Sequence, residues 1–167
     1  MRNKPVEPLF LGLEEALAIH QDQIERYGGR PGIRDMGLLQ SALAMPRAGS
    51  GGQYFHADLH EMAAAYLFHI VKDHPFVDGN KRVGALAAFI FLELNGITLK
   101  APGAAFEKLV LSVAGEGSDK AAIAAFFRKH AGLRGLSPRL RQLPGRARPT
   151  RAAIGVSRVF RRLRETR

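Results

Sequence analysis

The sequence predicts an all-α fold: one compact domain of about six helices around a buried central helix. Apolar residues recur at helical spacing through most of residues 1–133, without the alternation of strands and helices that marks a parallel sheet. The run VGALAAFIFL, residues 83–92, is apolar on every side of a helix, which is typical of a helix enclosed by its neighbours. At 167 residues the chain is long enough for one domain with a core and too short for two ordinary ones.

Three helices are expected before the central one. The first covers residues 14–27 and ends at two glycines. The second follows the capping carboxylate Asp35 and is stopped by Pro46. The third begins near residue 58 with two carboxylates three positions apart, a capping-box pattern. Between the second and third helices, the glycine-rich segment 48–57 carries two aromatic residues and is expected to be a mobile loop able to touch a partner.

The central helix is expected from about Asn80 to Leu94, and two further helices follow it. Residues 97–100 form a short extended piece before Pro102, which suits the first turn of the fifth helix. The sixth helix is expected over residues 118–130, with Gly132 as its C-terminal stop. The body of the chain is therefore predicted to be a single all-α domain without a βαβ alternation.

The net charge of +10 is confined to the end of the chain. Residues 1–133 hold 14 Lys and Arg against 14 Asp and Glu, whereas residues 134–167 hold 11 Arg against the single acid Glu165. This Arg-rich tail is expected to be disordered, because such a composition buries too little apolar surface to offset its ordering entropy. Binding of the tail to RNA or another acidic surface is an alternative in which charge, and not the folded body, carries the function.

The composition also indicates the cellular compartment of the protein. The chain has no cysteine, so disulfides and thiolate metal sites are excluded. Acidic residues interrupt the N-terminal segment before any sustained apolar region, and the longest apolar run has only ten residues. We therefore expect a cytoplasmic protein without a membrane span.

The most chemically dense stretch is HPFVDGNKR, residues 74–82. Pro75 places it in a loop before the central helix, whose N-terminus presents backbone N–H groups and the positive end of the helix dipole to a phosphate. Lys81 and Arg82 oppose that dipole, so an anionic ligand explains them better than helix stability does.

Each residue of the motif has a chemical and a structural interpretation. His74 can take a proton near neutral pH, or it can be a buried histidine with a hydrogen bond. Asp78 is a hard oxygen ligand suited to Mg²⁺, or the N-cap of the central helix. Gly79 allows close approach of an anion to the backbone, or only a tight turn.

The remaining motif residues surround the predicted phosphate site. Asn80, Lys81 and Arg82 are expected to contact phosphate oxygens, Arg82 as a bidentate fork and Lys81 as a mobile charge. The alternative is a solvated cationic turn. Phe76 is expected to be structural, with its ring anchoring the loop so that His74 points outward.

The motif resembles the signature of the Fic/Doc superfamily, HxFx[D/E]GN, which continues with GlyArg in the adenylyl-transferring Fic branch and with LysArg in the Doc branch. The resemblance covers about residues 9–131 and includes the GlyGlyGlnTyr loop and the LeuGluLeuAsnGly segment after the central helix. It implies a Doc (death on curing) toxin of a toxin–antitoxin pair, restrained by a small Phd-like or other antitoxin protein.

For the site, the resemblance implies a kinase that uses ATP and Mg²⁺. His74 would activate a threonine hydroxyl of elongation factor Tu, and the implied outcome is arrested translation. Lys81 distinguishes the two branches, because its side chain occupies space that a glycine leaves to a nucleotide phosphate. In the Doc branch this implies a reversed nucleotide that presents its γ-phosphate. A Fic-type transfer of AMP or another nucleotidyl group is the alternative.

Overall fold

A computed structural model describes residues 6–133, and the predicted Arg-rich tail, residues 134–167, lies outside the described residues. The described part contains six α-helices, which confirms the predicted fold class. The helices are α1 Leu13–Tyr27, α2 Met36–Ala44, α3 Leu59–Asp73, α4 Asn80–Leu94, α5 Gly103–Ala114 and α6 Lys120–His130, with a single 3₁₀ turn, η1, at Met45–Arg47.

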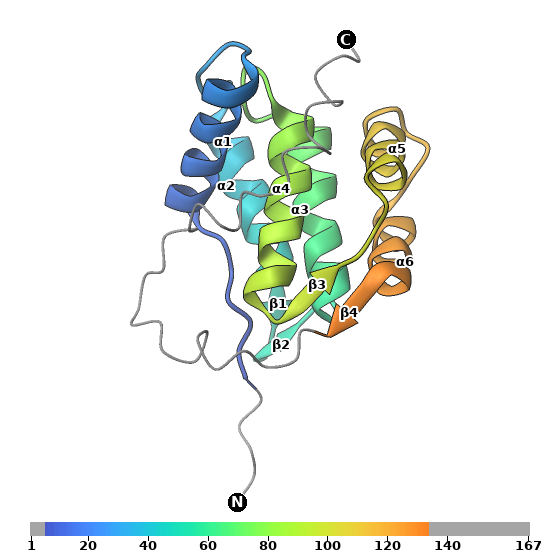
Figure 1. Cartoon of the computed structure of the whole chain (residues 1–167). Helices are drawn as coiled ribbons and strands as arrows, with labels where there is room; N and C mark the ends of the chain where they lie inside the picture. Colours follow the sequence, from blue (N-terminus) through green and yellow to red (C-terminus); the bar gives the residue numbers. More distant parts are fainter. Residues whose placement is uncertain (1–5, 134–167) are drawn as a thin grey trace, which may run out of the picture.

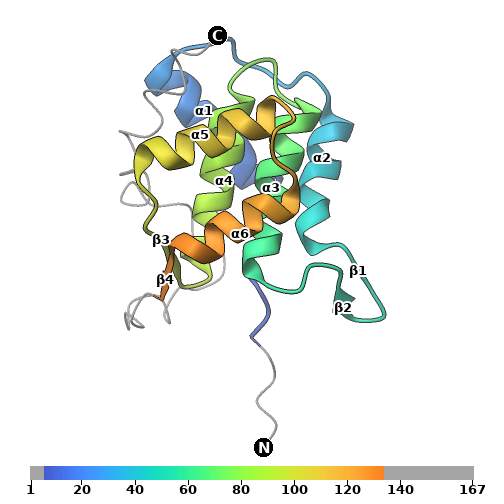
Figure 2. The same cartoon turned by 90° about the vertical axis from the view of Figure 1, so that its right-hand side faces the viewer.

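Helices α3 and α4 lie side by side through the middle of the molecule, with α1 and α2 on one side and α5 and α6 on the other (Figure 1). In the view turned by 90°, α5 and α6 cross in front of the central pair (Figure 2). The two central helices approach closely at Gly84, where an added Cβ would lie 2.9 Å from Cγ2 of Val71. Most of α4 is buried, as its uniformly apolar sequence predicts.

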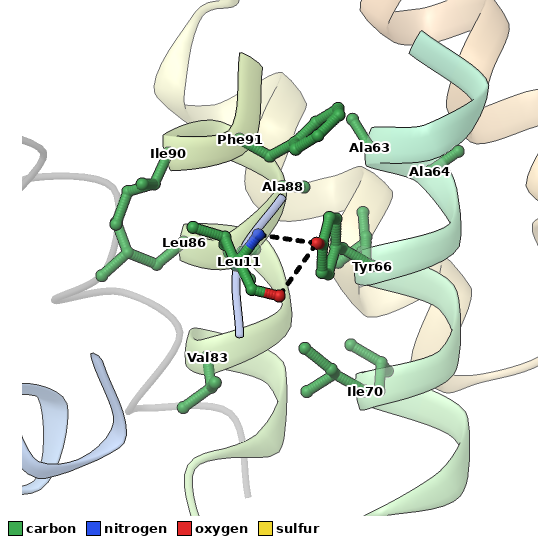
Figure 3. Packing of buried hydrophobic residues seen from close by; sticks show 14 of the residues in the cluster. Leu11, Ala63, Ala64, Tyr66, Ile70, Val83, Leu86, Ala88, Ile90 and Phe91 are labelled. Atoms are coloured by element: carbon green, nitrogen blue, oxygen red, sulfur yellow. Dashed lines mark hydrogen bonds between the residues drawn. The ribbon is translucent and has the colours of Figure 1, made fainter. Parts of the chain in front are cut away.

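The core between α3 and α4 also secures the N-terminal segment (Figure 3). The buried Tyr66 hydroxyl accepts a hydrogen bond from Leu11 N at 2.9 Å and donates one to Leu11 O at 3.2 Å. Because burial disfavours the phenolate, the pKa of Tyr66 is raised to about 12. At the end of α4, the Asn95 side chain makes a similar pair of hydrogen bonds with the backbone of Leu9.

The predicted helix starts are confirmed by their capping side chains. Asp35 accepts from Leu38 N, and Asp119 accepts from Ala122 N. Asp58 accepts from the backbone N–H groups of His60 and Glu61 in the first turn of α3, and the Glu61 carboxylate accepts from Ala57 N. No helix in the described part of the chain has the length and apolar character that crossing a membrane requires.

Two short antiparallel sheets accompany the helices, and one of them contains the predicted extended piece at residues 97–100. The segment expected to be a loop contains a hairpin of β1 Gly49–Ser50 and β2 Gln53–Tyr54. β3 Ile97–Leu99 pairs with β4 Ala131–Leu133, so Gly132 lies opposite Thr98 in a strand and does not stop α6. Helix α6 ends at His130, because the chain becomes extended at Ala131 to pair with β3.

Candidate functional site

The motif lies at the end of the central helix pair where α3 leads into α4, the upper end in Figure 1. Helix α3 ends at His74, whose backbone is left-handed (φ 47°, ψ 55°), an uncommon conformation for a residue other than glycine. The His74 side chain is exposed, whereas Phe76 is buried. The expectation that Phe76 anchors the loop is consistent with this burial.

The segment after α1 runs along the motif loop and pairs with it. Pro75 O accepts hydrogen bonds from the backbone N–H groups of Arg34 (2.7 Å) and Asp35 (3.0 Å). Val77 N donates to Gly32 O at 3.0 Å, and Ile33 forms an isolated antiparallel bridge with Phe76. Backbone hydrogen bonds therefore hold the loop in place on both sides of Phe76.

Arg34 is a residue of this site that sequence reasoning missed. Its Nε donates to the carbonyl of His74 at 2.5 Å, and its Nη2 donates to the carbonyl of Asp73 at 2.7 Å. The last carbonyls of a helix have no partner within the helix, and a cation there also suits the helix dipole. Arg34 thus stabilises the end of α3 at the residue with the left-handed backbone.

Asn80 closes the motif loop from inside. Its Oδ1 accepts from Phe76 N at 2.9 Å, and its Nδ2 donates to Phe76 O at 3.0 Å. The same Nδ2 lies 3.5 Å from Nδ1 of His74, so the amide is next to the imidazole. The buried Asn80 side chain is engaged with the loop, and its predicted phosphate contact stays a prediction.

Asp78 and Gly79 form the turn into α4. The N-cap of α4 is Gly79, with a left-handed backbone (φ 82°, ψ 9°), so the N-cap alternative for Asp78 was wrong. The half-buried Asp78 carboxylate instead accepts from Gly79 N at 2.7 Å and from Arg30 N at 3.2 Å. A left-handed turn favours glycine, because other residues suffer a steric clash there.

The two cations of the motif have different environments. Arg82 is buried, and its Nη1 donates to the carbonyls of Gln23 and Gly28, both at 3.0 Å. It therefore joins α4 to the C-terminal end of α1. Lys81 is half-buried. The turn is not the solvated cationic turn of the alternative interpretation, since Arg82 is almost entirely enclosed.

His20, in α1, also belongs to this site, and sequence reasoning did not single it out. Its Nε2 lies 3.0 Å from the carbonyl oxygen of Asp78, and its ring stacks on that of Phe76 with centroids 4.1 Å apart. Burial lowers the pKa of His20, and the nearby Arg82 adds to this, while the contacts with Asp78 oppose it. The available sequence signal was a polar residue on the buried face of α1.

The site thus combines an exposed imidazole and a half-buried carboxylate on one loop with the N-terminus of the buried helix that follows it. Among the described residues, no group of three or more His, Cys, Asp and Glu side chains is arranged to hold a metal ion. Asp78 is therefore not part of a metal cage built from three or more such side chains of the described residues.

Residues 10–92 match the family model described as the Fic/DOC family, and the chain belongs to that family. Its similarity to named relatives places it in the Doc branch. It is 43% identical over 75 residues to the Toxin Doc of Mycolicibacterium smegmatis, covering 45% of this chain and 58% of that protein. It is 37% identical over 84 residues to the Protein kinase doc of Escherichia phage P1, covering 50% of this chain and 66% of that protein. The chain thus spans less than two thirds of either relative.

Proposed function

We propose that this protein is a Doc-type toxin that transfers the γ-phosphoryl group of ATP to a Ser or Thr hydroxyl of another protein. The observation that carries the proposal is the HPFVDGNKR motif, folded so that an exposed His74 stands beside the N-terminus of a buried helix. The similarity to a protein named Protein kinase doc supports phosphoryl transfer in particular.

His74 is proposed as the general base. It accepts the proton of the attacking hydroxyl while that oxygen forms a bond to the γ-phosphorus, and the bond from the γ-phosphorus to the bridging oxygen breaks to release ADP. The side chain is open to an incoming protein, whereas its backbone is held by Arg34. The Asn80 amide beside Nδ1 restricts the orientation of the ring.

The start of α4 is proposed to hold the phosphates. Gly79 has no side chain to obstruct them, and the N-terminal end of a helix favours an anion. Lys81 supplies a mobile charge, and Arg82 and Asn80 complete the turn with a cation and an amide. In the structure, Nη1 of Arg82 donates to two carbonyls at the C-terminal end of α1, so we assign Arg82 chiefly the charge and the support of this turn.

Asp78 is proposed to hold Mg²⁺ together with the phosphates of ATP. One carboxylate can be enough for this ion, because Mg²⁺ keeps several waters and is commonly bound by one or two carboxylates plus substrate phosphates. Bound there, the ion would neutralise charge on the phosphates.

The partners follow from the same proposal. The acceptor is a threonine of elongation factor Tu, which would arrest translation, and a small antitoxin protein restrains the enzyme. The similarity to the protein named Toxin Doc supports a toxin of a toxin–antitoxin pair.

The test uses ATP labelled in the γ or the α position, with purified elongation factor Tu and, separately, a bacterial lysate. We expect γ-label on the acceptor protein, lost about 10²- to 10⁴-fold in His74→Ala and retained in the matched control His130→Ala, at the end of α6. Transfer of α-label would overturn the kinase in favour of nucleotidyl transfer. Transfer of neither label would overturn both.

A further inference from the structure

His20 is a buried titratable side chain with no role in the function proposed above. A polar ring in an apolar environment costs free energy unless it is hydrogen-bonded. The partner of His20 is not in its own helix but in the motif loop, 58 residues further along the chain. A carbonyl oxygen only accepts, so the ring nitrogen Nε2 carries the proton and donates to Asp78 O.

The peptide that receives this hydrogen bond controls the Asp78 carboxylate. Its C=O accepts from His20, and its N–H, that of Gly79, donates to the carboxylate Oδ1 at 2.7 Å. Glycine at position 79 offers little steric resistance to rotation of this peptide. A hydrogen bond from outside the loop is therefore needed to keep the N–H directed at the carboxylate.

The second contact of His20 holds the other half of the loop. Its ring lies against Phe76 with an interplanar angle of 7°, and Phe76 is two residues from His74. One imidazole thus contacts both neighbours of Val77 in the loop: the ring of Phe76 and the backbone of Asp78.

We propose that His20 is a positioning residue: it orients the 78–79 peptide by a hydrogen bond and the Phe76 ring by stacking, so that the Asp78 carboxylate and His74 keep their relative positions. His20 acts through the Asp78 backbone and the Phe76 ring, and it does not touch the reacting groups. The inference rests on the proposed function.

The test separates the two contacts of His20. His20→Phe keeps a ring for stacking and removes the donor, whereas His20→Gln keeps an N–H donor and removes the ring. The rate of γ-label transfer is measured against Mg²⁺ concentration at saturating ATP, together with the thermal midpoint. We expect His20→Phe to need about 10-fold more Mg²⁺ for half-maximal transfer, as when a residue supporting a metal ligand is lost. His20→Gln should stay nearer the native requirement.

The control is Ile19→Val, a buried neighbour in α1, which reduces packing without touching the donor and should keep the native Mg²⁺ requirement. A native Mg²⁺ requirement in His20→Phe would overturn the positioning role while leaving the proposed function intact. If the native protein transfers no label, the proposed function fails and the inference falls with it.

A measurement on the native protein serves if the variants do not fold. Nitrogen NMR of the His20 ring should show the proton on Nε2 at neutral pH. A proton on Nδ1 alone would overturn the inference, because the ring could not then donate to Asp78.

Discussion

The two ends of the central helix pair are constructed differently. At the motif end, side chains from α1, from the segment before α2 and from α4 converge on one loop through polar contacts. At the opposite end, the chain turns through two short sheets, and the hairpin leaves Tyr54 and Phe55 40% and 70% exposed (Figures 1 and 2). Long-range hydrogen bonds at the motif end therefore hold the residues of the proposed site, whereas those at the opposite end join the N-terminal segment to Asn95 and β3 to β4.

The contrast is tested most strongly at Asn80. In Asn80→Ala, the backbone N–H and C=O of Phe76 lose their side-chain partners while still buried, which costs about 1–3 kcal/mol of unfolding free energy. Transfer activity should fall as well, because the loop that carries His74 loosens. Urea denaturation and the labelled-ATP assay measure the two effects. An Asn80→Ala protein with native stability would show that the loop does not need this closure.

Arg34 is expected to have the next largest effect. Arg34→Ala removes two hydrogen bonds from the last carbonyls of α3 but leaves them near solvent, so we expect a loss of about 1 kcal/mol. The rate of transfer should fall more than the stability, since the backbone of His74 is released. Arg128→Ala is the control, because it removes exposed ion pairs with Asp58 and Glu61 away from the motif. Equal loss of activity in the two variants would contradict a specific role for Arg34.

The pH dependence of stability should reflect the burial of His20 at the motif end and of His69 in α3. Burial lowers the pKa of His20 and of His69, so the folded protein resists protonation below the ordinary value of 6.5. The unfolded chain then binds more protons than the folded one, and stability falls as the pH drops from 6.5 toward the lower folded pKa values. Denaturation in urea at pH 7.5 and pH 5.5 checks this, and the drop should be smaller in His20→Gln. A stability that rises over the same interval would contradict the stated sign.

The smallest effect is expected at the hairpin. Phe55→Ser removes an exposed aromatic side chain, so the unfolding free energy should change by no more than about 0.5 kcal/mol. The rate of phosphoryl-label transfer to a short acceptor peptide should equal that of the native protein. A large loss in that assay would mean that the two ends are coupled, against the comparison drawn above.

Much of the fold was predictable because its signals are local. A capping carboxylate and the apolar spacing that follows lie within one or two turns of the helix they define, as at Asp35 and Asp119. The predicted bounds of α4, Asn80 to Leu94, are those of the structure. The pairing of β3 with β4 joins segments more than 30 residues apart and leaves no local signal, which is why Gly132 was mistaken for a helix stop.

The candidate site divides in the same way. Nine consecutive residues identified the motif, its loop and its position before a buried helix, since residue chemistry and backbone preference are properties of the sequence itself. Only the tertiary structure decided that Arg82 binds the end of α1, that Asn80 closes the loop, and that Arg34 and His20 support it. These contacts join residues that the packing of α1 and α2 on the central pair brings together. A hydrogen bond depends on the distance and angle between donor and acceptor in space, which the order of residues along the chain does not reveal.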